Sequence, residues 1–175
     1  MSALFGGFSF LLIYVYWLVP LAPIVYIFIK WRMYRDNAPA DPQLGMKSVL
    51  YYFKTLAYQA CLASLAALFY GILKSQEDFI KIGLGIFVSS AILYIVQFLL
   101  IQKLTNTARF PLTERAYTGF NMIIVGLAAM ISFMITVTMV ISKGFQDIHL
   151  PLVIFIVYAA ALATQTVAFC KPSKK

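Results

Sequence analysis

Five apolar runs, each about as long as a transmembrane helix, occupy most of this 175-residue chain. A helix needs roughly 20 apolar residues to cross the hydrocarbon core of a bilayer. Four of the runs contain no Lys, Arg, Asp, Glu or His, and the remaining run contains only Lys54, near its start. The runs cover residues 8–29, 50–73, 82–102, 119–142 and 150–169. This pattern predicts an all-α, polytopic transmembrane helical bundle of about five spans.

The composition excludes a water-soluble protein. Hydrophobic residues make up 62% of the chain and charged residues only 11%, which leaves too few polar side chains to cover a soluble surface. The longest gap between runs, residues 30–49, is too short for a hydrophobic core of its own. We therefore expect a single integral-membrane domain over residues 1–175 and no extramembrane domain.

The Lys and Arg residues predict how the spans are oriented, because short loops rich in these residues stay in the cytoplasm. Eleven of the fourteen fall in the first gap, the start of the second run, the third gap or the C-terminal tail. We expect loops 30–49 and 103–118 and the C-terminus to be cytoplasmic, and the N-terminus to lie outside. We expect neither a cleavable signal peptide nor a transit peptide at residues 1–30, and therefore expect the bacterial inner membrane.

The net charge of +8 is spread over juxtamembrane positions, which suits anionic phospholipid headgroups better than nucleic acid. Lys47, Tyr51, Lys54 and Tyr58 share one helical face by their spacing. This face either reaches the headgroup layer through the Lys side chains or meets a cytoplasmic partner. The predicted headgroup contacts are Lys30, Arg32, Arg35, Lys47 and Lys54.

The first run differs from the others because seven of its residues are Phe, Tyr or Trp. Pro20 and Pro23 predict a kink that leaves the carbonyls of Tyr16 and Val19 without helical donors. Either a neighbouring helix satisfies these carbonyls or they bind a cation or a substrate. The run has no strip of small residues, so we expect it to face lipid or the chains of a partner protein.

The second run carries small side chains three and four residues apart along one side. Helices in lipid associate by close backbone approach, so such a strip predicts a packing seam. Its members are Ala57, Ala60, Ser64, Ala67 and Gly71. Short turns join the second run to the third and the fourth run to the fifth, which predicts two antiparallel hairpins beside the aromatic first helix.

Four amide side chains each lie five or six residues from a basic residue on the cytoplasmic side, and therefore roughly 8–9 Å inside the cytoplasmic boundary. They are Gln59, Gln97, Asn121 and Gln165. We expect one polar layer, which either holds the helices together by hydrogen bonds or lines a vestibule or a headgroup pocket on the cytoplasmic side.

The outer turns hold the one cluster suited to metal binding or acid–base chemistry. It consists of Glu77, Asp78, Asp147 and His149. Residues of this kind on outer turns are usually solvated, and the chain has no nucleophile–base set and no metal-binding motif. We expect no catalytic residue, no metal and no cofactor, and therefore no enzyme.

These observations leave three interpretations of function. The first is a non-catalytic subunit that packs into and stabilises a larger membrane complex and meets other membrane chains through its first helix. The second is a homo-oligomeric channel or a transporter for small solutes or lipids, with the amide layer on its route. The third is a membrane enzyme or cofactor-binding subunit that uses the outer acids and His149.

Overall fold

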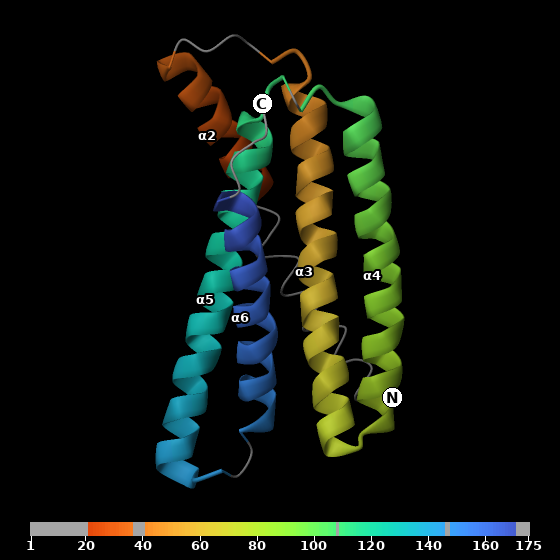
Figure 1. Ribbon diagram of the computed structural model, residues 1–175, viewed down its shortest axis with the longest axis vertical. Coiled ribbons are helices and arrows are strands. Elements are labelled where there is room, and N and C mark those ends of the chain that lie inside the picture. The colour runs from red at the N-terminus through yellow and green to blue at the C-terminus, as the bar shows by residue number, and fades with distance from the viewer. Residues whose placement is uncertain (1–20, 37–40, 108, 146–147, 171–175) are drawn as a thin grey trace. The chain divides into compact units, whose positions relative to one another are not determined.

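A computed structural model describes residues 21–36, 41–107, 109–145 and 148–170 of the chain, which form five α-helices and no strand (Figure 1). This confirms the all-α class. The helices are α2 (Leu21–Arg35), α3 (Leu44–Lys74), α4 (Glu77–Leu104), α5 (Leu112–Lys143) and α6 (His149–Cys170).

Four of these helices are long and apolar enough to cross a membrane: α3, α4, α5 up to Ser142, and α6. They match the last four predicted runs, so the chain has the make-up of a multi-pass membrane protein. The first predicted span, residues 8–29, is described only from Leu21, in α2. The kink at Pro20 lies outside the described residues. A fifth span and the orientation of the chain therefore stay predictions.

Helix α3 begins six residues before the predicted run, because Asp41 organises the turn that precedes it. The Asp41 carboxylate accepts a hydrogen bond from the amide of Gln43 at 3.0 Å. The backbone carbonyl of Asp41 accepts one from the amide of Leu44 at 3.2 Å. Asp is among the residues that best satisfy the unpaired amides at a helix start. With 31 residues, α3 is about 46 Å long, so it exceeds the roughly 30 Å hydrocarbon core.

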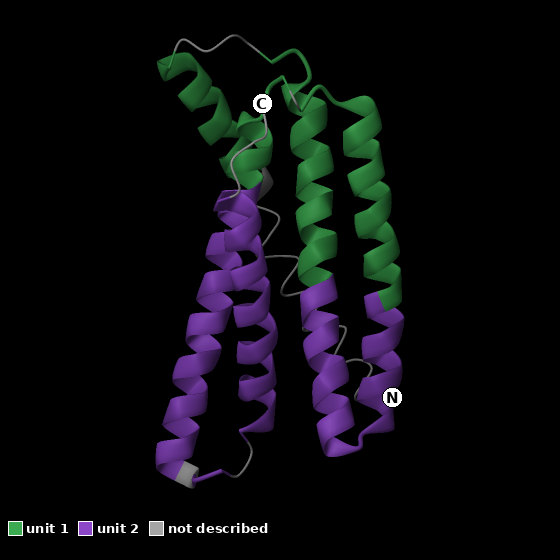
Figure 2. Cartoon of the chain, in the orientation of Figure 1, with its two compact units in different colours: residues 1–60, 88–117 green, residues 61–87, 118–175 purple. Residues whose placement is uncertain are grey.

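The described residues divide into two compact units (Figure 2). The first contains the described residues within Met1–Ala60 and Val88–Tyr117, and the second those within Cys61–Phe87 and Thr118–Lys175. Helices α3, α4 and α5 each contribute to both units.

In the second unit, α3 and α4 form an antiparallel pair with very close backbone contact. A Cβ atom added to Gly71 would lie 2.9 Å from the amide nitrogen of Ile80, and one added to Gly83 would lie 2.9 Å from that of Leu68. Only glycine permits this approach. Helices α5 and α6 also pair in an antiparallel sense, since Gly126 faces Leu162 and the ring of Phe133 lies 5.1 Å from that of Phe155.

The turn between α3 and α4 closes α3 with a Schellman motif. The amide of Gln76 donates to the carbonyl of Gly71 at 2.9 Å, and the amide of Ser75 donates to that of Ile72 at 3.2 Å. The motif places Ser75 in the left-handed region, with φ at 53°. Helix α4 then starts with Glu77 and Asp78 in its first turn, where negative charge suits the helix dipole.

Candidate functional site

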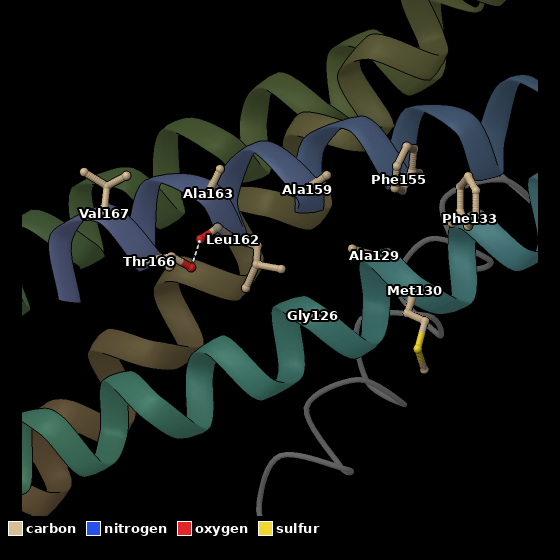
Figure 3. A pocket seen from close by; sticks show the side chains of 10 residues that line it. All are labelled: Gly126, Ala129, Met130, Phe133, Phe155, Ala159, Leu162, Ala163, Thr166 and Val167. Atoms are coloured by element: carbon tan, nitrogen blue, oxygen red, sulfur yellow. Dashed lines mark hydrogen bonds between the residues drawn. The ribbon is translucent and has the colours of Figure 1, made fainter. Parts of the chain in front are cut away.

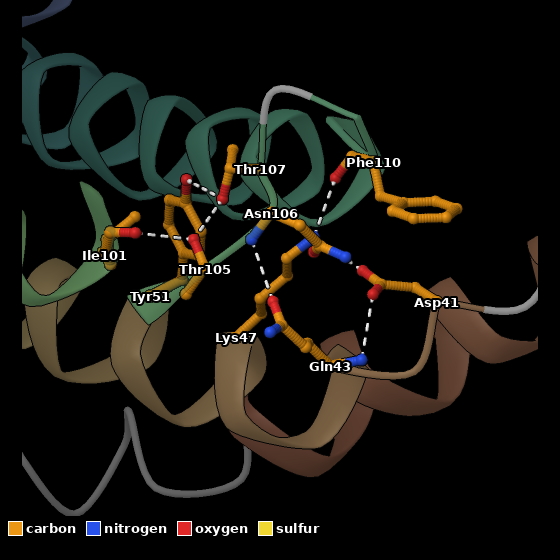
Figure 4. A network of polar contacts seen from close by, with 9 residues as sticks. All are labelled: Asp41, Gln43, Lys47, Tyr51, Ile101, Thr105, Asn106, Thr107 and Phe110. Carbon is orange, nitrogen blue, oxygen red and sulfur yellow. Dashed lines mark hydrogen bonds and ion pairs between the residues drawn. The ribbon is translucent and has the colours of Figure 1, made fainter. Parts of the chain in front are cut away.

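A group of polar side chains in the first unit ties the start of α3 to the loop between α4 and α5 (Figure 4). Together we call these residues the polar network. Its members are Asp41, Gln43, Lys47, Tyr51, Thr105, Asn106 and Thr107, with the carbonyl of Phe110.

Lys47 lies at the centre of the polar network and is completely buried. Its ammonium donates to the Asp41 carboxylate at 2.7 Å and to the Phe110 carbonyl at 3.3 Å, and it lies 5.4 Å from the Phe110 ring centroid. The predicted headgroup contact of this residue stays a prediction, while the structure gives its ammonium partners inside the protein. A lysine reaches outward when its charge has no partner at depth, whereas here Asp41 and Phe110 satisfy it.

The remaining bonds of the polar network hold the α4–α5 loop against α3. The side-chain carbonyl of Gln43 accepts from the amide of Asn106 at 2.8 Å. The Thr105 and Thr107 hydroxyls lie 2.7 Å apart, and Tyr51 donates to Thr107 at 3.4 Å. The Tyr51–Thr107 and Gln43–Asn106 contacts join residues 56 and 63 positions apart in the sequence, so they fix the loop conformation.

Lys54 lies among aromatic rings and is half-buried. Its ammonium is 5.5 Å from the ring centroid of Tyr51, 5.6 Å from that of Tyr94 and 5.3 Å from that of Phe98. Cations are attracted to aromatic faces at such distances. Lys54 was also a predicted headgroup contact, and these rings provide an attraction within the protein itself.

The other three predicted headgroup contacts, Lys30, Arg32 and Arg35, are exposed on α2. Both arginines form ion pairs with Asp36, at 3.4 and 3.2 Å, and Arg35 also lies over the Trp31 ring. Their exposure is compatible with headgroup contacts, which stay predictions.

A cavity of about 270 Å³ lies beside the polar network, at the start of α5, and we call it the α5 cavity. It is cationic, because Arg109 and Arg115 are among its lining residues. Its lining residues are Met33, Asp41, Arg109, Phe110, Pro111, Leu112, Thr113 and Arg115.

An open apolar groove of about 770 Å³ lies between α5 and α6 in the second unit (Figure 3). Small residues form much of its floor, namely Gly126 and Ala129 on α5 and Ala159 and Ala163 on α6. The residues that line the groove have almost no polar side chains, so the groove contains no group suited to catalysis or metal binding.

The predicted packing strip on α3 is partly enclosed. Ala57, Ser64 and Gly71 are buried, whereas Ala60 and Ala67 are half-buried. Of these five residues, Gly71 is the one whose neighbours on another described helix are identified: they are Phe79 and Ile80, at the start of α4.

The four predicted amides divide between the units. Gln59 and Gln97 belong to the first unit, and Asn121 and Gln165 belong to the second. Gln59 and Asn121 are buried, and the side-chain oxygens of Gln97 and Gln165 are buried with no hydrogen-bond partner among the described residues. A single layer across all four amides stays a prediction.

The outer acidic cluster shows no sign of a metal centre in the part of the chain that is described. Glu77 forms an exposed ion pair with Lys81 at 2.9 Å, Asp78 is exposed, and His149 is half-buried at the start of α6. Asp147 lies outside the described residues. Within the described ranges, no three His, Cys, Asp or Glu residues are placed to hold an ion.

Neither the partners of Lys47, Asp41 and Phe110, nor the contact between Gln43 and Asn106 was predicted from the sequence. The available signal was an acid six residues before a lysine, in a loop with two prolines. The partners across the fold carry no such signal.

No protein-family model matches this chain, and neither the curated proteins nor the solved structures contain a match.

Proposed function

We propose that this chain is a non-catalytic integral-membrane subunit that packs into a larger membrane complex through its first helix. The observation that carries the proposal is the two-sided character of α2. Val25 and Ile29 are completely buried on one side of this helix. The other side exposes the large apolar residues Ile24, Ile27, Phe28, Trp31 and Tyr34.

Aromatic residues such as Phe28 and Trp31 are enriched at the centres of protein interfaces, where they bury much area at little entropic cost. Lipid alone also covers an apolar side, but it does not require three exposed aromatic residues, Phe28, Trp31 and Tyr34, on one side of a helix. In this proposal, loops 30–49 and 103–118 and the C-terminus lie in the cytoplasm of a bacterial cell, as the distribution of Lys and Arg supports.

Site-specific photocrosslinking in intact membranes tests the proposal. A crosslinking residue at Ile27 or Trp31 should give one discrete adduct with a different protein chain. The same residue at Ile29, which is buried, is the matched control and should give none. Adducts with lipid only, from both exposed positions, would contradict the proposal.

A self-associating channel or carrier is the second candidate. The buried side-chain oxygens of Gln97 and Gln165 favour it, because they have no hydrogen-bond partner among the described residues and a solute or water could supply one. Adducts formed only between copies of this chain would support this candidate instead, and the mass of the crosslinked product distinguishes the two.

A further inference from the structure

The α5 cavity has the chemistry of an anion site, beginning with its charge. Arg109 and Arg115 line it, and both are exposed at its edge. The one carboxylate in the lining, Asp41, is neutralised by Lys47 at 2.7 Å. Glu114 does not line the cavity and interacts electrostatically with Lys54 instead. The cavity therefore carries uncompensated positive charge.

The start of α5 adds hydrogen-bond donors to this charge. The first helical bond runs from the amide of Arg115 to the carbonyl of Pro111, so the amides of Leu112, Thr113 and Glu114 have no acceptor within the helix. Pro111 occupies the position just before the helix, where a polar side chain often caps the free amides, and the proline side chain has no polar group. A helix of 32 residues also places partial positive charge at this end.

Thr113 is an independent sign of a ligand. This residue lines the cavity, is only 2% exposed, and its hydroxyl has no hydrogen-bond partner among the described residues. Hydroxyls of residues this buried usually have a hydrogen-bond partner, so a hydroxyl on the cavity lining without one among the described residues is a position that a bound group can complete.

We propose that the α5 cavity binds a phosphoryl group, through Arg109, Arg115, the Thr113 hydroxyl and the free amides of the first turn of α5. Helix starts combined with arginines are well suited to phosphate oxygens. A volume of about 270 Å³ falls below the roughly 300–1,000 Å³ of pockets for drug-sized ligands, so the cavity takes a small group.

Two sources supply this chemistry at a membrane surface. One is the headgroup of an anionic phospholipid, and the other is free phosphate. The site does not depend on the proposed partner of α2, so either proposal can fail without the other.

Binding is measured with the full-length chain in nonionic detergent at about 0.15 M salt, which screens diffuse attraction. The probes are short-chain phosphatidic acid, short-chain phosphatidylcholine as the zwitterionic control, and inorganic phosphate. We expect saturable binding of phosphatidic acid in preference to phosphatidylcholine. Competition by inorganic phosphate would assign the site to the phosphoryl group alone, whereas a lack of competition would assign it to the lipid.

The variants separate a defined site from general basicity. Arg115→Gln should weaken binding about tenfold, as expected for loss of a charge-assisted hydrogen bond. Thr113→Val removes a hydroxyl without changing net charge and should weaken binding several-fold, whereas Thr113→Ser should retain it. Lys103→Gln removes an exposed charge from the same unit and should have little effect. Failure of phosphatidic acid and phosphate to bind would overturn the proposal, and so would binding unchanged by both Arg115→Gln and Thr113→Val.

Discussion

The Lys47 ammonium lies 2.7 Å from the Asp41 carboxylate, and the two side chains are only 0% and 3% exposed. The other ion pairs in the described residues, Arg32 and Arg35 with Asp36 and Lys81 with Glu77, are exposed. Exposed pairs contribute little to stability, whereas breaking a buried pair leaves an uncompensated charge. The energetic importance of charge in this fold is therefore concentrated at Lys47 and Asp41.

Replacing Lys47 alone should destabilise the protein strongly. In Lys47→Met the Asp41 carboxylate stays buried without its cation, and we expect a loss of about 3–5 kcal/mol in the free energy of unfolding. Reversible unfolding in detergent, followed by circular dichroism, measures this loss. The double variant Asp41→Asn, Lys47→Met should lose clearly less, and Lys81→Met, in the exposed pair, at most about 1 kcal/mol. Equal losses in Lys47→Met and Lys81→Met would contradict the buried pair.

Replacing Gly83 with alanine should separate α3 from α4. The new Cβ would lie 2.9 Å from the amide nitrogen and 3.1 Å from the Cα of Leu68, which are backbone atoms that cannot move aside alone. We expect a loss of about 1–3 kcal/mol, typical of overpacking. Gly85→Ala is the matched control, because no described atom lies within 4 Å of its Cβ position. Because alanine has a higher helix propensity than glycine, Gly85→Ala should be neutral or slightly stabilising. The thermal unfolding midpoints of the two variants test this comparison.

Replacing Ser75 with glycine should stabilise the turn after α3. Ser75 has φ at 53°, a region that is unfavourable for residues with a Cβ atom and open to glycine. We expect a gain of about 0.5–1 kcal/mol, offset in part by the greater freedom of glycine in the unfolded chain. Ser75→Val should be destabilising. The same unfolding assay checks both, and a Ser75→Gly variant less stable than Ser75→Val would refute the assigned conformation.

Replacement by leucine should affect the free energy of unfolding differently at Gln165 and at Gln59. Gln165→Leu removes a buried oxygen without a partner, so we expect an unchanged or slightly higher free energy of unfolding. Gln59 is completely buried and takes part in interactions, so Gln59→Leu should cost about 1–2 kcal/mol. A large loss of stability in Gln165→Leu would show instead that this amide holds helices together.

The apolar runs predicted the elements well and their ends less well. The four runs from residue 50 onward coincide with α3 to α6, because the length of an apolar segment is a local property that the printed sequence displays. The start of α3 at Leu44 depends on the capping turn at Asp41, where individual hydrogen bonds outweigh hydropathy. The partners of Lys47 were not predicted for a related reason, since they lie outside the helical face from which its headgroup role was argued.

The sequence by itself determined that this chain consists of long apolar helices with charge confined almost entirely to the segments between them, because hydrophobicity and helix length are summed along neighbouring residues. Only the tertiary structure decided which lysine is enclosed, which glycines permit backbone contact, and that Arg109, Thr113 and Arg115 line one cavity with Asp41. These relationships join residues that are distant along the chain, and their free energies depend on distances of a few ångströms that no local pattern specifies.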